Sequence, residues 1–369
     1  MTRKEADISL QAALDALIAQ TVRHLNQEPL VNRIITLMPR RLTRFGAATL
    51  AVALATSWLT EVPAQPPIKI RNGLFDQGKP LTLGLSPIKA DHQILYRATG
   101  DSYKFCHHAN ITLWKNSLYL MWSNGIEAED FNGQRILCSR SEDGLKWSQP
   151  TVLVEDPDGD GPFACVAAGW HAAGDSLVAY YTAIIDGKPI HERNTLFCIT
   201  SHNGDTWGKA RELTRGFFIE GPRALPNGRL LMNGQSVNMQ PRMQYTDATG
   251  GVSDWMDATI PEIKNVFTFP EPSWFRRRDG AIVATFRTKS GDPWIYSSVS
   301  KDHGATWSEP AKTNFPDATA RAFAGNLPNG TAFIISNPNT TPDKTHPTIG
   351  LRNPLAIALS KDGVLFDRA

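Results

Sequence analysis

The chain has 369 residues, 41% hydrophobic and 20% charged, which is enough to bury the core of one large domain or two modest ones. Its 38 basic and 36 acidic side chains leave a net charge of only +2, which argues against a nucleic-acid or anionic-membrane partner. Gly (28), Pro (25) and Trp (10) are frequent, a composition typical of an all-β protein with many tight turns.

The N-terminal part of the chain carries an export pattern. Three arginines within residues 40–44 precede an uncharged run over residues 45–59, and small residues follow at 62–64. This order of basic, apolar and small residues predicts a signal peptide over residues 38–64 and a secreted or periplasmic protein. The apolar run is shorter than the ~20 residues that span a bilayer, so no membrane anchor is expected after cleavage.

Residues 1–37 precede the signal peptide as a leader. Their pattern of apolar residues fits an amphipathic helix. Two interpretations stay open: Met1 is the true start, or translation starts at Met38 and the leader is not part of the protein.

Four cysteines follow the leader, at Cys106, Cys138, Cys165 and Cys198. An even number in an exported chain permits disulfides in three pairings, and buried thiols on strands are the alternative. No CxxC spacing occurs, so no zinc site is expected. The acidic stretch 156–160 resembles a calcium loop in composition only. Apart from a structural calcium there, the sequence indicates no cofactor.

A short motif recurs along the chain: Ser, an Asp or Asn two residues later, then Gly and an aromatic residue. Three good copies, one copy that ends in Phe and one degenerate copy lie at Ser141–Trp147, Ser201–Trp207, Ser300–Trp307, Ser360–Phe366 and Thr246–Trp255. These segments resemble the Asp-box of sialidases and related β-propellers. The resemblance implies an all-β propeller in which each Asp-box forms a hairpin.

The Asp-box has a local physical logic. Its Gly supplies a turn with positive φ, its Asp or Asn caps backbone N–H groups, and its aromatic ring packs under the hairpin. We therefore expect a structural role for these aspartates. Asp143 and Asp302 should lie between the third and fourth strands of their blades, away from the central channel.

A second repeat interleaves with the first: an apolar strand, a polar turn and another apolar strand. The turns fall near Asn116, Gly174, Asn227, Asp279 and Asn329. Together the two repeats predict four-stranded blades, five of them from about residue 104 onward, with Ile68–Arg97 adding strands of another. Residues 65–369 are thus expected to form a six- or seven-bladed propeller. Its last blade and ring are expected to be truncated at Ala369.

Polar residues recur just before the innermost strands, where a propeller lines its channel. They are His107, His108, Glu220, Arg223, Glu271, Asp317, Arg321 and Arg352. Their recurrence at one phase of the repeat predicts a site at one mouth of the channel. The tri-arginine turn 276–278 lies outside this phase, and we interpret it as a solvated charge cluster.

The resemblance to sialidases implies particular roles. Those enzymes hold the substrate carboxylate with three arginines and use a Tyr nucleophile, a Glu and an acidic Asp. Glu271 with Arg287 matches their Glu and second Arg, and Arg352 matches the third. The Tyr would fall beyond residue 369, and the acid near Glu127, Glu129 or Asp130. Where the first Arg belongs, the chain has His107 and His108.

The histidine pair changes the expected chemistry. The segment Tyr103–Trp147 resembles sialidase-like propellers that attack glucuronate-containing glycans, some of them lyases. This resemblance implies that Arg287 or Arg223 neutralises a uronate carboxylate and that His107 or His108 removes the C5 proton. Tyr181 would protonate the leaving oxygen, and Arg321, Arg352 and Glu220 would bind substrate.

Two classes of function follow. The first is an enzyme that cleaves a terminal linkage in an acidic glycan, with a uronate lyase ahead of an exo-sialidase or other exo-glycosidase. The second is a non-catalytic glycan-binding propeller. The clustered His, Glu and Arg favour the enzyme. This site assignment predicts that His107 or His108 converges with Glu271, Arg287 and Arg352 around one pocket.

Overall fold

The computed structural model describes residues 65–98, 103–155, 163–185, 193–289, 291–345, 347 and 350–369. All of them belong to one compact unit, Pro63–Ala369. The leader, the signal peptide and the 156–160 loop predicted above lie outside the described residues. Among those described, there is no helix long and apolar enough to cross a membrane.

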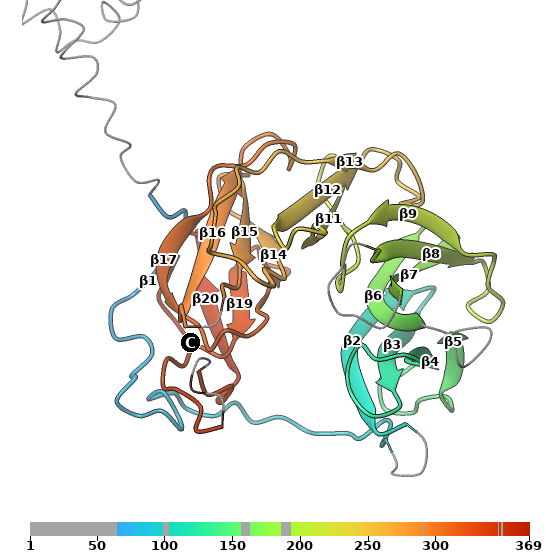
Figure 1. The fold of residues 1–369 in the computed structure, drawn as a ribbon, viewed down its shortest axis with the longest axis horizontal. Helices are drawn as coiled ribbons and strands as arrows, with labels where there is room; N and C mark the ends of the chain where they lie inside the picture. Colours follow the sequence, from blue (N-terminus) through green and yellow to red (C-terminus); the bar gives the residue numbers. More distant parts are fainter. Residues whose placement is uncertain are drawn as a thin grey trace, which may run out of the picture. The chain divides into compact units, whose positions relative to one another are not determined.

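The first two blades are antiparallel four-stranded sheets in chain order (Figure 1). Blade 1 consists of β2 (Phe105–Trp114), β3 (Ser117–Gly125), β4 (Arg135–Ser141) and β5 (Thr151–Val154). Blade 2 consists of β6 (Phe163–Ala173), β7 (Ser176–Ile185), β8 (Thr195–Ser201) and β9 (Arg211–Arg215).

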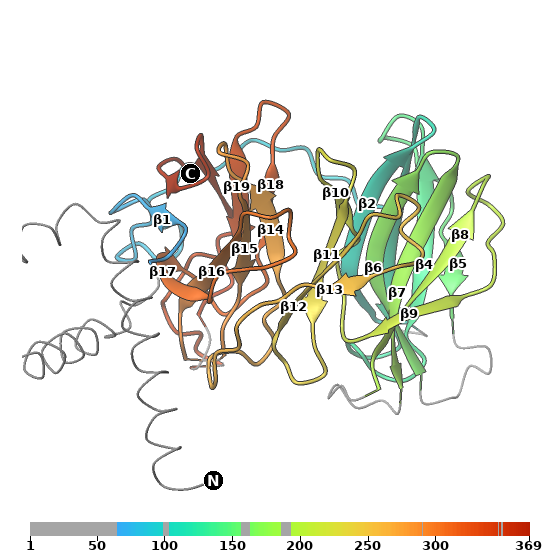
Figure 2. The same ribbon diagram turned by 90° about the horizontal axis from the view of Figure 1, so that it is seen from above.

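Three further sheets follow along the chain. Blade 3 contains β10 (Arg223–Ala224), β11 (Leu230–Gln235), β12 (Pro241–Thr246) and β13 (Met256–Asp257). Blade 4 contains β14 (Ser273–Arg276), β15 (Ile282–Phe286), β16 (Trp294–Ser300) and β17 (Ala311–Pro316). Blade 5 contains β18 (Phe323–Asn326), β19 (Ala332–Ser336) and β20 (Ala356–Ser360). In Figure 2 the strands of blade 3 lie between those of blades 1 and 2 and those of blades 4 and 5.

The propeller arrangement is confirmed, but the expected six or seven blades are wrong for this chain, because the described residues form five. Within Ile68–Arg97 the structure describes one short strand, β1 (Lys69–Ile70), which pairs in parallel with β21 (Leu365–Phe366). Tight turns follow β1, with positive φ at Gly73, Leu83 and Gly84. Because such turns break the extended backbone, the segment connects blades instead of forming one.

The N-terminal segment is anchored to blades 4 and 5, which come last in the chain. The side-chain amide of Asn314 exchanges two hydrogen bonds with the backbone of Ile70, at 2.9 and 3.0 Å. Gln77 similarly bonds to Pro338 and Thr340. From there the chain runs to the start of β2, as Figure 1 shows. Blade 5 has a rudimentary outer edge, a single bridge between Leu359 and Arg368.

The Asp-box hairpins lie where the sequence predicts, each after the third strand of a blade. In blade 1, Asp143 Oδ1 accepts hydrogen bonds from the backbone N–H of Leu145 and Lys146, at 2.8 and 2.7 Å. Gly144 donates to Ser141 Oγ, and the Trp147 indole donates to the Gly144 carbonyl. The degenerate copy keeps its last contact, from the Trp255 indole to the Gly251 carbonyl.

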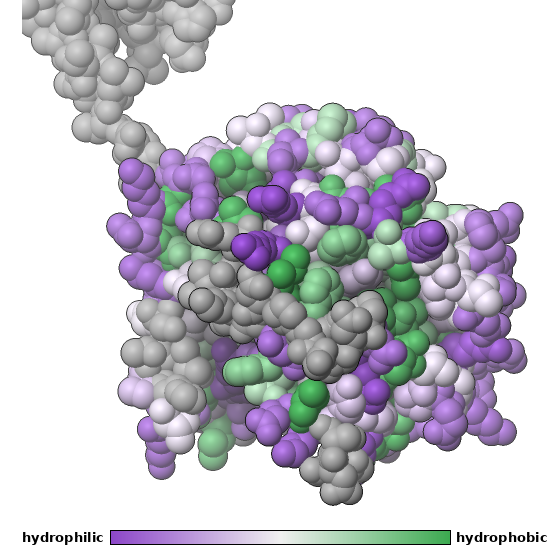
Figure 3. Space-filling view, turned by 45° about the vertical axis from the view of Figure 1, so that its right-hand side comes forward, coloured by the Kyte–Doolittle hydropathy of each residue, from purple (hydrophilic) through white to green (hydrophobic). Residues whose placement is uncertain are grey.

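Tryptophans join neighbouring blades. The Trp114 indole of β2 donates to the Gly174 carbonyl in blade 2, and the Trp170 indole of β6 donates to the Asn110 carbonyl in blade 1. Both rings are almost completely buried in one cluster with Tyr119. On the face shown in Figure 3, hydrophilic residues cover much of the periphery and hydrophobic ones gather in short patches. All four cysteines lie in the described part of the chain and are thiols, without disulfides.

Candidate functional site

The site lies at one end of the inner hairpins. Glu271 precedes β14 and Arg287 follows β15, and antiparallel pairing of these strands brings both residues to the same end. Their side chains form an ion pair, with Arg287 Nη1 2.5 Å from Glu271 Oε2, and both are largely buried. Arg321 occupies the equivalent place before β18 in blade 5.

A cavity of about 520 Å³ opens at this end of the strands. Its polar lining comes from blades 1, 3, 4 and 5 or the segments that join them, and includes His107, His108, Glu129, Asp130, Gln235, Glu271, Arg287, Arg321 and Arg352. Phe131, Phe217, Ile219 and Phe269 supply apolar surface. The structure thus brings both histidines together with Glu271, Arg287 and Arg352 around one pocket.

A β-bulge places the two histidines. The β2–β3 pairing shifts between His107 and Asn110, and His108 has a positive φ of 52°. A non-glycine residue in this region costs roughly 1–3 kcal/mol, and such strain concentrates at functional sites. The Asn110 amide supports the bulge by donating to the His108 carbonyl at 3.0 Å. As a result the two imidazole rings lie 3.8 Å apart between their centroids.

The two histidines have different environments. His107 Nδ1 lies 2.8 Å from Glu129 Oε2, and both side chains are about half exposed. His108 is buried, and burial lowers its pKa well below the usual range, as do the charges of His107 and Arg321. His108 is therefore a neutral part of the wall, whereas His107 is accessible and oriented by a carboxylate.

Carboxyl groups beside the cavity also differ. The hydrogen bond from His107 lowers the pKa of Glu129, and the charges of Arg352 and Arg287 lower it further. Burial raises the pKa of the neighbouring Asp130 to about 6, helped by the negative charge of Glu129. The sequence predicted an acid near Glu127, Glu129 or Asp130 without choosing among them. In the structure, Glu129 and Asp130 line the cavity.

Asp317 follows β17 and is completely buried. Burial raises its pKa to about 7, against the lowering effect of the Ala320 N–H and of Arg287 and Arg352. Asp317 is not among the residues that line the cavity. Its carboxyl group interacts electrostatically with Arg287 and Arg352, which do line the cavity.

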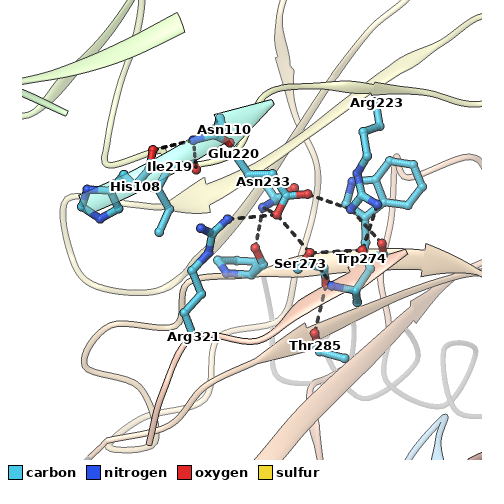
Figure 4. Close-up of polar contacts among 12 residues, drawn as sticks. His108, Asn110, Ile219, Glu220, Arg223, Asn233, Ser273, Trp274, Thr285 and Arg321 are labelled. Carbon is cyan, nitrogen blue, oxygen red and sulfur yellow. Dashed lines mark hydrogen bonds and ion pairs between the residues drawn. The ribbon is translucent and has the colours of Figure 1, made fainter. Parts of the chain in front are cut away.

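Glu220 and Arg223 do not line the cavity, contrary to the expectation that they bind substrate. Figure 4 shows Glu220 between two guanidinium groups, 2.9 Å from Arg223 Nη2 and 3.2 Å from Arg321 Nη2. Ser273 and Asn233 also donate to this buried carboxylate. Glu220 thus positions Arg321, which lines the cavity, whereas Glu220 and Arg223 do not.

Arg223 is occupied by the protein itself. It donates to the backbone carbonyls of Ala324 and Trp274, at 2.9 and 2.7 Å, and its guanidinium lies 4.1 Å from the centre of the Trp274 ring. These contacts join blades 3, 4 and 5. A substrate carboxylate would have to displace them, so Arg223 is a structural residue.

Tyr181 was expected to be the acid, and this prediction is wrong. It lies on β7, is 6% exposed and stacks on Phe197 at 5.5 Å in the core between blades 1 and 2. Burial raises its pKa above the usual tyrosine value. The strand alternation that turns a side chain toward a neighbouring blade instead of the channel was not evident from the repeat phase alone.

The comparisons with known proteins agree with this architecture. Residues 116–369 match the model of the BNR repeat-like domain, and the chain belongs to that family. A search of curated proteins gives no match. The resemblance to sialidase-like Asp-box propellers is thereby confirmed at the level of family and fold.

Several solved structures share the fold at low identity. A protein of unknown function from Dyadobacter fermentans is 13% identical, with a TM-score of 0.54 over 72% of this chain and 85% of that one. A sialidase is 15% identical, with a TM-score of 0.54 over 82% of this chain and 30% of that one. Trypanosoma rangeli sialidase in complex with sialic acid is 12% identical, with a TM-score of 0.51 over 69% of this chain and 46% of that one. The chain thus spans less than half the length of either sialidase.

Proposed function

We propose that the protein is a glycan-degrading enzyme that cleaves a uronate-containing chain by β-elimination. One observation carries the proposal: the His107–Glu129 pair and the guanidinium groups of Arg287, Arg321 and Arg352 line the same cavity. A base beside a cluster of cations is what abstraction of a proton next to a carboxylate requires.

The arginines supply carboxylate recognition. Among the described residues, each contacts one protein oxygen: Arg287 one of Glu271, Arg321 one of Glu220, and Arg352 the Thr319 carbonyl at 3.2 Å. Each guanidinium has five N–H donors, so donors remain for a ligand. Binding the uronate carboxylate in this way would stabilise the negative charge that develops when the C5 proton leaves.

His107 is the base in this proposal. In the neutral imidazole, donation from Nδ1–H to Glu129 selects the tautomer in which Nε2 carries the free lone pair. His108, whose pKa burial lowers well below its usual range, packs against the His107 ring. The roles are therefore divided: His107 moves the proton, and His108 shapes the wall.

Asp130 takes the place of Tyr181 as the acid. Its raised pKa, about 6, keeps part of the population protonated near neutral pH. In the reaction, His107 takes the C5 proton, the C4–O bond breaks, and a C4–C5 double bond forms. Asp130 gives its proton to the departing oxygen. Phe131 and Phe269 offer apolar surface for the sugar rings.

Two alternatives remain as outcomes of the test. Asp130 as an acid would also serve a glycosidase. A glycan-binding propeller would use the same arginines without the base.

The test is incubation with oligosaccharides of glucuronate, galacturonate and mannuronate. A lyase produces a conjugated unsaturated uronate, seen by its ultraviolet absorbance. Reducing sugar without that absorbance would mean a hydrolase, and binding without either product would mean a lectin. Either result would overturn the elimination mechanism.

A further inference from the structure

A second cavity, of about 610 Å³, lies at the opposite end of the inner hairpin of blade 4. Three successive arginines of the β14–β15 turn line it, together with Lys361 of the blade 5 Asp-box and the polar side chains of Asn326 and Asn329. Among the described residues that line it there is no carboxylate. We call this cavity the basic cleft.

The basic cleft is separate from the site described above. Glu271 and Arg287 flank the start of β14 and the end of β15, whereas the arginines 276–278 form the turn between the two strands. At about 3.3 Å per residue, the four residues of β14 separate the two ends by roughly 10–13 Å. A single carboxylate or sulfate group in the basic cleft therefore does not reach the catalytic cavity.

The arginines are not needed to form the turn. Residues 225–229, 277–281 and 327–331 make equivalent turns in blades 3, 4 and 5. In each, the first N–H donates to the last carbonyl, at 2.8–2.9 Å, and the Gly N–H donates to the first carbonyl. Blades 3 and 5 build this turn from Leu-Pro-Asn-Gly, and blade 4 from Arg-Arg-Asp-Gly. Turn formation therefore gives no reason for the arginines.

The arginine turn is also held firmly against blade 5. Asn326 accepts from the Arg276 N–H and donates to the Arg276 carbonyl, both at 2.8 Å. The Arg278 N–H donates to the Asp362 carbonyl at 3.1 Å. The stem of Arg277 packs over Gly363, where an added Cβ would lie 2.9 Å from Arg277 Cγ. The cations thus project from a fixed backbone.

We propose that the basic cleft binds carboxylate or sulfate groups of an acidic polysaccharide, as a second contact for the substrate class proposed above. Only the class of ligand rests on that proposed function. Asp279 pairs with Arg277, at 2.6 Å, and leaves Arg276, Arg278 and Lys361 for the ligand. Arginine suits planar oxyanions because it donates two parallel hydrogen bonds to them.

The experiment measures binding of fluorescently labelled polygalacturonate, dextran sulfate and neutral dextran to the full chain. The main variant, Arg276→Ala/Arg277→Leu/Arg278→Pro/Asp279→Asn, gives residues 276–280 the sequence that residues 224–228 already have. A second variant, Arg276→Ser/Arg278→Ser/Lys361→Ser, leaves the turn backbone unchanged. The control, Lys209→Ser/Lys301→Ser, removes two charges elsewhere; Lys301 holds the place in the blade 4 Asp-box that Lys361 holds in blade 5.

We expect both variants to bind at least one of the acidic polymers at least about tenfold more weakly, with the control unchanged and neutral dextran unbound. Cleavage of a short uronate oligosaccharide should be unaffected, because it occupies only the cavity. Unchanged binding in both variants, or an equal loss in the control, would overturn the proposal. Equal affinity for a DNA oligonucleotide would overturn the glycan assignment. If no glycan is cleaved but the binding loss is found, the basic cleft stands and only the proposed catalysis fails.

Discussion

Aspartates occur in two regions of this propeller with opposite electrostatic environments. In the Asp-box hairpins, backbone N–H groups of Lys146 and Leu145 bond to Asp143 and lower its pKa. Beside the cavity, burial raises the pKa of Asp130 to about 6 and that of Asp317 to about 7. The same side chain thus stabilises a turn in one region and is able to hold a proton in the other.

The difference separates residues that stabilise the fold from residues that line the candidate active site. The hairpin contacts recur in blade after blade, so they reflect what every blade needs. The cavity groups have no such repeat: a bulge places the histidines of blade 1, and a buried Glu220 orients Arg321 of blade 5. We therefore expect substitutions in the two regions to separate activity from stability.

The largest effect is expected for His107→Gln. Removing a general base typically lowers kcat by about 10²–10⁴-fold. The matched control is His202→Gln, since His202 Nδ1 also bonds to a side chain, Ser176 Oγ at 3.1 Å, but in an Asp-box turn. Steady-state kinetics on the best uronate substrate should show the loss only at position 107. Equal losses in both variants would contradict the assignment of the base.

Arg287→Ala should lower kcat/KM on acidic glycans by at least about tenfold, because it removes a charge-assisted contact to the substrate carboxylate. Arg287→Lys keeps the charge but not the planar donor geometry, so it should recover part of the loss. Activity toward uronate substrates should be compared with that toward their methyl esters. An equal loss on both would show that Arg287 does not recognise the carboxylate.

The pH dependence should identify the acid. As pH rises through about 6, Asp130 loses the proton that the leaving oxygen needs, so kcat/KM should fall by about tenfold per pH unit above that value. Asp130→Asn should lower the rate and remove this alkaline limb. A limb that persists in the variant would assign the proton to another group.

In the hairpin region, Asp302→Ala should reduce the free energy of unfolding by about 1 kcal/mol, as the loss of other backbone caps does. Asp302 accepts from the Thr306 N–H at 2.9 Å and from the Thr306 hydroxyl at 2.6 Å. Asp302→Asn should be nearly neutral, because Asn203 holds this place in blade 2. Urea unfolding gives the energies, and activity per folded molecule should not change in either variant.

Asp317 should give a signal in stability that depends on pH. Its pKa is about 7 in the folded chain and about 3.9 when unfolded, so the folded state binds the extra proton between these values. Stability therefore falls as pH rises from about 4 to about 7. Asp317→Asn should flatten this slope in urea unfolding measured across that interval. The same slope in variant and wild type would mean that Asp317 is ionised throughout.

Much of the fold was predictable because its signals are local. The Asp-box bonds join residues within a few positions of one another, as from Gly144 to Ser141, and the inner hairpins turn where Asn116, Asn227 and Asn329 predict. The phase of the repeat also selected Glu271 and Arg352, and the resemblance to sialidases added Arg287; the structure gathers all three around the cavity. The export signal and the catalytic roles stay predictions.

The sequence by itself determined the blade unit, the hairpins and the end of the strands at which polar residues gather, because these depend on alternation and turn chemistry. The tertiary structure alone decided the rest. The number of blades, the burial of Tyr181 between blades and the use of Arg223 on backbone carbonyls all depend on contacts between segments far apart in the chain. The pairing of His107 with Glu129 also depends on such contacts, because it requires a β-bulge that the local sequence does not predict.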